Sequence, residues 1–225
     1  MSQVVILIPP SEGKAASGDE KPLGCFSTDI KVMHDRLTAY RGDLSALYGV
    51  KGKALEAAKT ANAQLLTSPT LEAIFRYSGV VYDGIDYSTL PPKARNFFND
   101  HVRIISALFG LLKPQDLIPD YKLKIEKLDA AQFWRPIIAR QLTGCFVIDL
   151  LPQAHQKAVE YQQGINVDFI VTKKGQSVPA GHFGKLIKGR FVRWLCEHAV
   201  TKPEHFTEFH QDGFKFDGVN FVKGS

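Results

Sequence analysis

The chain has 225 residues, 44% of them hydrophobic and 15 of them Phe, which is enough apolar material for a sizeable core. Its 28 Lys and Arg against 23 Asp and Glu give a net charge of +5, compatible with nucleic acid or anionic metabolites as partners. No run approaches the ~20 apolar residues of a membrane span, and three cysteines without a Cys-x-x-Cys pair argue against a disulfide framework or a thiolate zinc site.

The first half of the chain begins with a predicted buried strand at residues 4–8, too short for a signal peptide and followed at once by Pro9-Pro10. This start and the free thiols predict a cytoplasmic protein. After a loop rich in Gly, Ser and charge, helices are predicted at residues 29–47 and 51–66. Ser68-Pro69 predicts the start of a short helix that ends near Tyr77. A strand at 80–82, a helix at 93–99 and a buried strand at 102–108 follow.

In the second half, Asp129 followed three residues later by Gln132 resembles a capping box, which predicts a helix from there to Gly144. Strands are predicted at residues 146–150 and 167–172, a helix at 184–198, and a hairpin around Asp217-Gly218. Strands thus alternate with helices, and the end of the chain is antiparallel. We expect an α/β protein with a mixed sheet and helices around it, forming a single domain over residues 1–225.

The predicted helix at 184–198 combines an apolar stripe with a basic face. The stripe has helical spacing and consists of Ile187, Phe191, Trp194 and Leu195. The opposite side holds four basic residues, namely Lys185, Lys188, Arg190 and Arg193. No acidic residue lies between Asp168 and Glu197, so this face has no acidic partner nearby in the sequence. The helix is either an ordinary solvated amphipathic helix or an anion-binding face, on which Gly189 would let a backbone or a phosphate approach closely.

The loop after the first strand reads Pro9-Pro10-Ser11-Glu12-Gly13-Lys14. A hydroxyl, a glycine and a lysine after a buried strand are parts of a phosphate-binding loop. The Walker pattern fails, because Ile8 stands where its first glycine belongs and Ala15 where its hydroxyl belongs. The loop therefore binds an anion without P-loop ATP hydrolysis, or it is an ordinary turn at the end of a strand.

Two further motifs carry polar groups. The segment Gly79-Val80-Val81-Tyr82-Asp83-Gly84-Ile85-Asp86 predicts a strand that ends in a phenol and a carboxylate, either as active-site groups or as plain turn residues. The segment Phe109-Gly110-Leu111-Leu112-Lys113-Pro114 resembles the turn of a helix-hairpin-helix DNA-binding element. Nearby lysines would add positive charge to it, namely Lys113, Lys122 and Lys124.

The C-terminal region gathers Glu and His residues that invite a metal site: Glu197, His198, Glu204, His205, Glu208 and His210. No pair has the His-Glu-x-x-His arrangement, and a surface helix explains the pattern more simply. We therefore expect neither a metal site nor a cofactor, and iron binding by this cluster remains the weakest interpretation.

Taken together, these segments resemble the YaaA family, also known as DUF328 or UPF0246, of peroxide stress proteins. The resemblance rests on residues 8–14, 79–86 and 107–116, the last continuing to Tyr121-Lys122-Leu123. It is extended by Phe133-Trp134, by the basic helix from Lys185 to Arg193 and by Thr201-Lys202-Pro203-Glu204. It therefore spans nearly the whole chain.

The resemblance implies a cytoplasmic protein that protects cells during hydrogen peroxide stress by limiting free intracellular iron. It also implies the mixed α/β fold called cantaloupe, with a positively charged cleft and a helix-hairpin-helix element that bind double-stranded DNA. With the basic residues of the motifs above, the expected DNA contacts are Lys14, Lys113, Lys122, Lys124, Lys185, Lys188, Arg190 and Arg193.

The alternative is an enzyme that acts on a small anionic or nucleotide-like substrate in the same cleft. Lys14 and Lys185 would then hold the anion, and Asp83 would serve as a base or as an orienting group. Both polar motifs follow predicted strands, where the sites of α/β proteins cluster. Convergence of these three residues in a narrow pocket would favour the enzyme, and an open basic groove would favour DNA.

Overall fold

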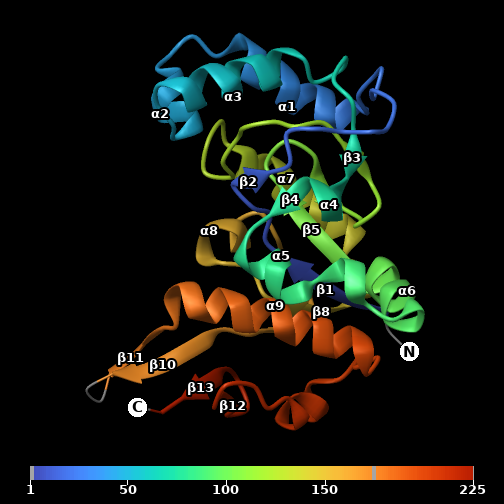
Figure 1. Cartoon of the computed structure of the whole chain (residues 1–225), viewed down its shortest axis with the longest axis vertical. Coiled ribbons are helices and arrows are strands. Elements are labelled where there is room, and N and C mark those ends of the chain that lie inside the picture. Colours follow the sequence, from blue (N-terminus) through green and yellow to red (C-terminus); the bar gives the residue numbers. More distant parts are fainter. Residues whose placement is uncertain (1–2, 174–175, 225) are drawn as a thin grey trace.

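The computed structural model of the chain describes residues 3–173 and 176–224. Its central sheet has the strand order β6-β5-β1-β8-β9 (Figure 1). These strands are β1 (Val4–Ile8), β5 (Val102–Ser106), β6 (Gly110–Leu112), β8 (Phe146–Asp149) and β9 (Gln163–Asn166). β1 pairs in parallel with β5 on one side and with β8 on the other, and β9 continues the parallel order. Every residue of β1 is buried, as expected for a continuous apolar strand in a sheet covered on both faces.

A second sheet has the order β11-β10-β13-β12 and lies beside the last long helix, α9 (Gly181–Glu197) (Figure 1). Its strands are β10 (Phe169–Lys173), β11 (Gln176–Pro179), β12 (Lys215–Phe216) and β13 (Phe221–Lys223). β12 and β13 form the predicted hairpin, in which the Asp217 amide donates to the Asn220 carbonyl. β13 also pairs in parallel with β10, so the mixed α/β class is confirmed. The single-domain interpretation stays a prediction.

Three helices form the N-terminal layer at the top of Figure 1: α1 (Thr28–Ala39), α2 (Leu44–Tyr48) and α3 (Lys53–Ala63). The single helix predicted at 29–47 is wrong, because the chain leaves the helix at Tyr40 and restarts at Asp43. The Asp43 carboxylate accepts a hydrogen bond from the Ser45 amide at 2.8 Å and caps α2. The remaining helical elements are α4 (Ala73–Arg76), α5 (Val80–Ile85), η1 (Tyr87–Thr89), α6 (Pro92–His101), α7 (Ala130–Gln141), α8 (Gln153–Gln156) and η2 (Pro203–Glu208).

Ser68-Pro69 does not begin a helix, contrary to the prediction. The segment instead contributes β3 (Leu71–Glu72), which pairs with β7 (Leu117–Ile118), and β4 (Tyr77–Ser78), which pairs with β2 (Gly13–Lys14). Only α4, between these strands, is helical. The buried Arg76 guanidinium at its end donates to the carbonyl of Pro69 and to three carbonyls of distant segments, those of Ala15, Ser17 and Ile118. These tertiary contacts override the local start signal.

The strand predicted at 80–82 is wrong, because these residues open the helix α5. Its Gly84 lies against α9, where an added Cβ would be 2.5 Å from the Leu186 carbonyl oxygen. On α9, a Cβ at Gly189 would be 2.1 Å from the Val81 carbonyl oxygen. The two glycines let the helix backbones touch, and this packing overrides the strand preference of Val and Tyr. Gly189 thus admits a backbone, which was one of its two expected roles.

The segment expected to form a helix-hairpin-helix turn is a β-hairpin, in which β5 and β6 pair antiparallel with Ser106 opposite Gly110. The helix-hairpin-helix assignment to this segment is therefore wrong. Gly110 has a φ of 74°, and a Cβ there would be 2.6 Å from the Trp134 ring. Close packing of this turn on α7 is the reason for the glycine. The predicted α7 is present, but Asp129 has a φ of 55° and makes no side-chain capping bond.

Candidate functional site

A cleft lies at the carboxyl ends of β1 and β8. β5 lies next to β1 on one side, and β8 followed by β9 lies on the other side. The chain therefore builds the sheet outward in opposite directions from β1 and β8, and the switch point lies between these two strands. Such a switch point is where open α/β sheets bind ligands. Two cavities of about 470 and 110 Å³ adjoin here. They share four lining residues, namely Pro10, Ser11, Glu12 and His155, and we call them together the cleft.

The larger cavity lies between the loop after β1, the start of α5 and the first turns of α9, which contributes His182, Lys185 and Lys188. The smaller cavity is lined by Lys14 and by a segment that contributes Tyr121, Lys122 and Lys124. Five of the eight expected DNA-contacting side chains therefore line the cleft, from segments far apart in sequence. Of the proposed enzyme residues, Lys14 and Lys185 line it and Asp83 does not.

Lys14 is partly buried, and its ammonium lies over two aromatic rings. Its Nζ is 4.4 Å from the centroid of Tyr121 and 5.4 Å from that of Tyr77. Its hydrogen bond to the Ser11 carbonyl measures 3.2 Å, and no carboxylate of the described residues forms an ion pair with it. Burial, with added repulsion from the Lys122 ammonium, lowers the pKa of Lys14 to about 8. An appreciable fraction of this amine is therefore neutral at physiological pH.

The two rings belong to a buried chain of hydroxyls. The Tyr77 and Tyr121 oxygens are 2.7 Å apart, and Ser106 Oγ lies 2.8 Å from the Tyr121 oxygen. Ser106 Oγ also accepts from the Phe109 amide. Burial raises the pKa of Tyr121 to about 12, so the phenol stays protonated beside the Lys14 amine. The hydroxyl chain fixes the surface on which Lys14 rests.

Glu12 forms ion pairs with two of the lysines that line the smaller cavity. Its carboxylate lies 2.9 Å from Lys124 Nζ and 3.7 Å from Lys122 Nζ. The hydrogen bond from Lys124 is the largest cause that lowers the pKa of Glu12. Two further carboxyl groups are near: Glu126 lines the same cavity, and the charge of Asp120 acts on Lys14 and opposes the lowering of its pKa.

Lys188 lies at the floor of the larger cavity with only 9% of its surface exposed. Its ammonium donates to the Leu150 carbonyl and is 4.0 Å from the Asp168 carboxylate. Burial lowers the pKa of Lys188, and burial likewise raises the pKa of the nearby Asp149 to about 6. Lys188 is therefore too deep to meet the backbone of a duplex.

His155 is a cleft residue that the sequence did not indicate. It follows β8 on the short helix α8 and lines both cavities. Burial lowers the pKa of His155 to about 4, so the ring is neutral at physiological pH. Its Nδ1 is buried and has no hydrogen-bond partner among the described residues. No motif surrounds it, and only its position just after a central strand could have indicated it.

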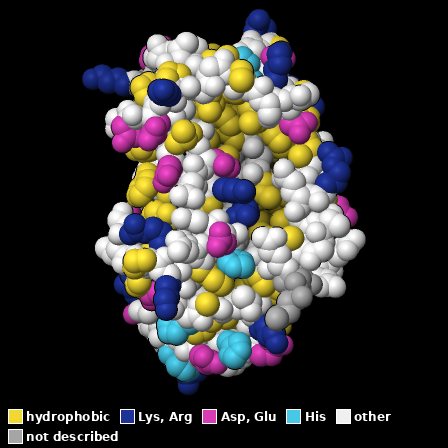
Figure 2. All heavy atoms as spheres, turned by 90° about the vertical axis from the view of Figure 1, so that its right-hand side faces the viewer, with side chains coloured by type: hydrophobic (Ala, Val, Ile, Leu, Met, Phe, Trp, Pro, Cys, Tyr) yellow, Lys and Arg dark blue, Asp and Glu magenta, His cyan; other side chains and the backbone are white. Residues whose placement is uncertain are grey.

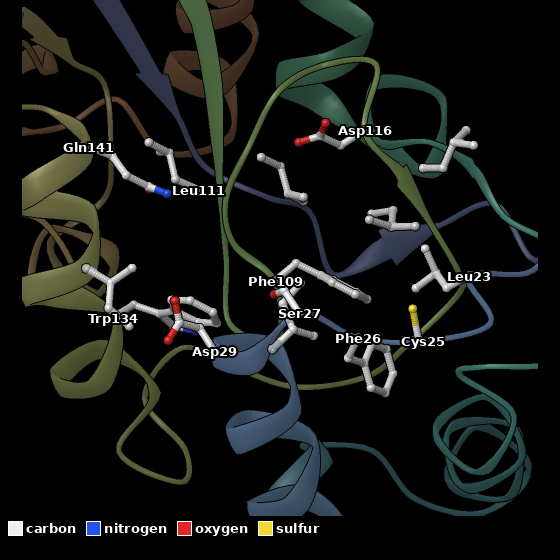
Figure 3. A pocket seen from close by; sticks show the side chains of 15 residues that line it. Leu23, Cys25, Phe26, Ser27, Asp29, Phe109, Leu111, Asp116, Trp134 and Gln141 are labelled. Atoms are coloured by element: carbon white, nitrogen blue, oxygen red, sulfur yellow. The ribbon is translucent and has the colours of Figure 1, made fainter.

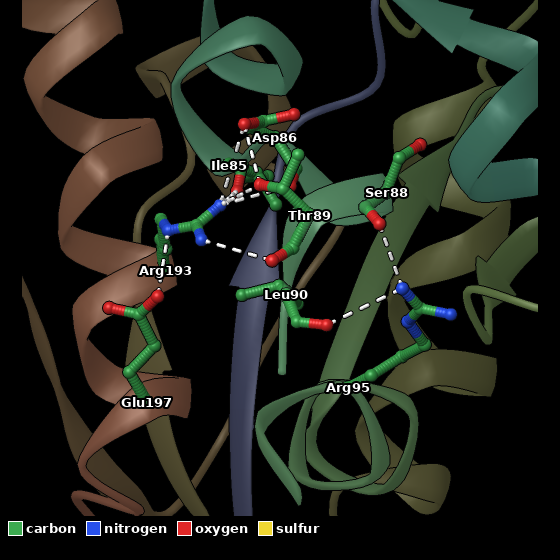
Figure 4. A network of polar contacts seen from close by, with 8 residues as sticks. All are labelled: Ile85, Asp86, Ser88, Thr89, Leu90, Arg95, Arg193 and Glu197. Atoms are coloured by element: carbon green, nitrogen blue, oxygen red, sulfur yellow. Dashed lines mark hydrogen bonds and ion pairs between the residues drawn. The ribbon is translucent and has the colours of Figure 1, made fainter. Parts of the chain in front are cut away.

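The basic face predicted for α9 does not form an unpaired positive surface. Arg190 is 2.7 Å from the Asp212 carboxylate. Arg193 donates to the Ile85 and Asp86 carbonyls and to both oxygens of Thr89, and it pairs with Glu197 (Figure 4). The expectation failed because Glu197 lies one turn beyond Arg193 on α9 itself, and because the other acidic and carbonyl partners come from other elements of the fold.

Two other expected residues lie outside the cleft lining. Asp83 is exposed on α5, on the helix that replaces the predicted strand. Lys113 follows β6, and its backbone amide donates to the Asp116 carboxylate. In the C-terminal region, the Glu and His residues make no metal site: within residues 3–173 and 176–224, no group of three or more His, Cys, Asp or Glu is arranged to hold a metal ion.

A separate hollow of about 440 Å³, lined by both apolar and polar side chains, lies between the loop before α1, the β5–β6 hairpin and α7. Its lining includes Phe26, Phe109 and Trp134, with Asp29 and Asp116 as its acidic groups (Figure 3). In Figure 2, hydrophobic side chains gather in the hollowed upper half of one face, and charges of both signs are scattered over the rest. None of the predicted contact residues lines the hollow of Figure 3. No helix in the described part of the chain is long and apolar enough to cross a membrane.

The fold and the cleft define an α/β protein that gathers lysines at the carboxyl ends of its central parallel strands. The family model described as peroxide stress protein YaaA matches residues 4–219. A UPF0246 protein of Rhizorhabdus wittichii is 28% identical, over 93% of this chain and 87% of its own length. UPF0246 proteins of Corynebacterium glutamicum and Corynebacterium efficiens are each 33% identical, over 86% and 91% of this chain and 85% and 88% of their own lengths. The chain belongs to the YaaA family of peroxide stress proteins.

Proposed function

We propose that this member of the YaaA family binds double-stranded DNA through the mouth of the cleft, in the cytoplasm, and helps limit free intracellular iron during peroxide stress. The observation that carries the proposal is the gathering of lysines from three segments around one opening. Lysines at the rim can neutralise phosphates and release their counterions, which gives affinity without sequence preference.

We limit the proposed contact set to exposed lysines of the cleft. Lys122, Lys124 and Lys185 lie at the cleft and are at least partly exposed, so they are the proposed phosphate contacts. Arg190 and Arg193 already have partners within the fold and are left out. Glu12 would be displaced from Lys124 when a phosphate enters, since both compete for the same ammonium.

The test is duplex affinity of the purified protein as a function of salt concentration. Lys122→Ala with Lys124→Ala should lower the affinity, and the slope of log affinity against log salt should fall by about one for each phosphate that is no longer neutralised. Lys51→Ala with Lys53→Ala removes two exposed lysines at the start of α3 and is the control matched for net charge. An unchanged salt slope in the Lys122→Ala, Lys124→Ala double variant would show that these lysines of the cleft do not contact the duplex.

A second candidate is a small anionic or nucleotide-like ligand, which an enzyme would transform. It is favoured by the depth of Lys14 and Lys188 and by the position of the cleft at the strand ends. A bound ligand raises the melting temperature by an amount that grows with the ratio of its concentration to its Kd. We expect a nucleoside diphosphate to stabilise the wild type and to lose this effect in Lys185→Ala. A melting temperature that stays constant up to millimolar nucleotide would reject this candidate.

A further inference from the structure

The geometry points to Lys14 as a nucleophilic amine that forms an imine with the aldehyde of a phosphate-bearing ligand. Lys14 lines the smaller cavity of the cleft, and its Nζ rests on the rings of Tyr121 and Tyr77 rather than against a carboxylate. An amine placed in this way is held at a fixed position and remains free to react. The inference goes beyond phosphate binding, because neutralising a phosphate requires only an exposed ammonium.

Lysine becomes a nucleophile when its surroundings disfavour the ammonium form. Burial and the neighbouring Lys122 act in this direction at Lys14 and lower its pKa to about 8. At pH 7 about one tenth of such an amine is neutral, against roughly one in three thousand for a lysine with its ordinary pKa. The amine of Lys14 is thus available for addition where exposed lysines are almost wholly protonated.

The surrounding charges indicate the ligand class. Lys122 and Lys124 line the same cavity as Lys14, and both form ion pairs with Glu12. Glu126 also lines this cavity, and the charge of Asp120 acts on Lys14. A phosphate next to the aldehyde would replace the Glu12 carboxylate at these ammonium groups and hold the carbonyl near Nζ. A neutral aldehyde would gain nothing from them, so phosphate is the expected companion group.

The reaction needs no oxidant or reductant. The neutral amine of Lys14 adds to the carbonyl carbon, and a proton passes from nitrogen to the carbonyl oxygen to give a carbinolamine. Loss of water then forms the C=N bond of the imine. His155, whose ring is neutral, lines both cavities and can carry a proton between nitrogen and oxygen.

Two sources offer this chemistry: a small phosphorylated aldehyde, or the sugar aldehyde of an abasic site in DNA, which lies between two phosphates. Only the second rests on the proposed duplex binding. Borohydride reduces an imine to a stable secondary amine, so the full-length protein is incubated with glyceraldehyde 3-phosphate or with an abasic duplex in the presence of this reagent. The modified residue is then located by mass spectrometry.

We expect Lys14 to be trapped at least about tenfold faster than the exposed Lys53 at pH 7, with a rate that rises with pH and levels off above about pH 8. Lys14→Arg keeps the cation and should abolish the trapped product. Trapping by the abasic duplex alone assigns the aldehyde to DNA, and trapping by the triose alone assigns it to a metabolite.

Equal modification of Lys14 and Lys53, full trapping in Lys14→Arg, or no trapped product with either probe would overturn the inference. The last result leaves the duplex-binding proposal intact, since affinity for an undamaged duplex is measured without borohydride. Conversely, trapping of the triose with no duplex affinity would keep the inference and reject DNA as the ligand.

Discussion

The cationic side chains of this protein fall into two regions that behave differently. In the second half of α9, Arg190 and Arg193 are bound to carboxylates and carbonyls of neighbouring elements and of α9 itself. In the cleft, Lys14 rests on two aromatic rings, and Lys122 shares a single carboxylate with a neighbouring lysine. Guanidinium carries five donors in a fixed plane and can tie several acceptors, whereas an ammonium is compact and is displaced more readily.

The two regions also differ in their effect on stability. The Arg193 guanidinium joins α9 to the end of α5 and to η1, where Asp86 has a φ of 46° (Figure 4). Nearby, Arg95 donates to the Ser88 and Leu90 carbonyls and holds the other end of the same turn. These bonds stabilise the fold, whereas the desolvated Lys14 opposes it. A group that weakens its own fold at a cavity is a mark of a functional site.

Gly189→Ala should have the largest effect, because it separates the two helices on which the arginine region depends. The new Cβ would be 2.1 Å from the Val81 carbonyl oxygen, which is backbone and cannot rotate away. We expect a loss of about 3 kcal/mol in the free energy of unfolding, or failure to fold. Gly224→Ala, where no atom lies within 4 Å, is the control. Equal stability of the two variants in denaturant titrations would show that the helices do not cross as described.

Arg193→Ala should have the next largest effect, because it leaves the carbonyls of the α5–η1 turn without their donor. We expect a loss of about 2 kcal/mol in the free energy of unfolding, measured by denaturant titration. The folded variant should bind duplex DNA with unchanged affinity and salt slope. If the folded Arg193→Ala protein had the stability of the wild type and a reduced salt slope for duplex binding, Arg193 would be a DNA contact rather than a structural residue.

The sequence predicted the elements whose pattern is local. The apolar run of β1, the α9 stripe and the Asp217-Gly218 turn all take the expected form, because burial on both faces, helical spacing and turn chemistry act within a few residues. The α5 segment failed for the opposite reason. Its helix is fixed by contact between Gly84 and the backbone of α9, about a hundred residues later, and no local pattern carries that information.

The sequence likewise indicated some residues of the cleft and missed others. The loop that ends in Lys14 and the lysines of the 121–124 segment do line one cleft, because position after a central strand determines where such a loop lies. The pairing of Arg190 with Asp212 could not be predicted, since it depends on how the last segment folds back on α9. His155 was missed because its environment, rather than its neighbours in sequence, makes it distinctive.

Lys14→Met should have the smallest effect on stability, and of the opposite sign. Methionine keeps the length of the side chain and removes the desolvated charge, so the free energy of unfolding at pH 7 should rise by about 1 kcal/mol, a figure reduced for the partial exposure of this site. The folded state holds the pKa of Lys14 at about 8 against its ordinary 10.5. Between these values the unfolded chain binds more protons, so the wild type gains stability as pH rises.

The difference between wild type and Lys14→Met should therefore be full below pH 8 and vanish by about pH 10.5. Denaturant titrations of both proteins at pH 7 and pH 10 measure it, and the subtraction removes the titration of the tyrosines and cysteines common to both. A Lys14→Met protein that is less stable than the wild type at pH 7 would mean that the ammonium is stabilised where it lies. Lys14 would then stabilise the fold, as the arginines of α9 do. Its surroundings would not disfavour the ammonium form, and the proposed nucleophilic reaction of its amine would have no support.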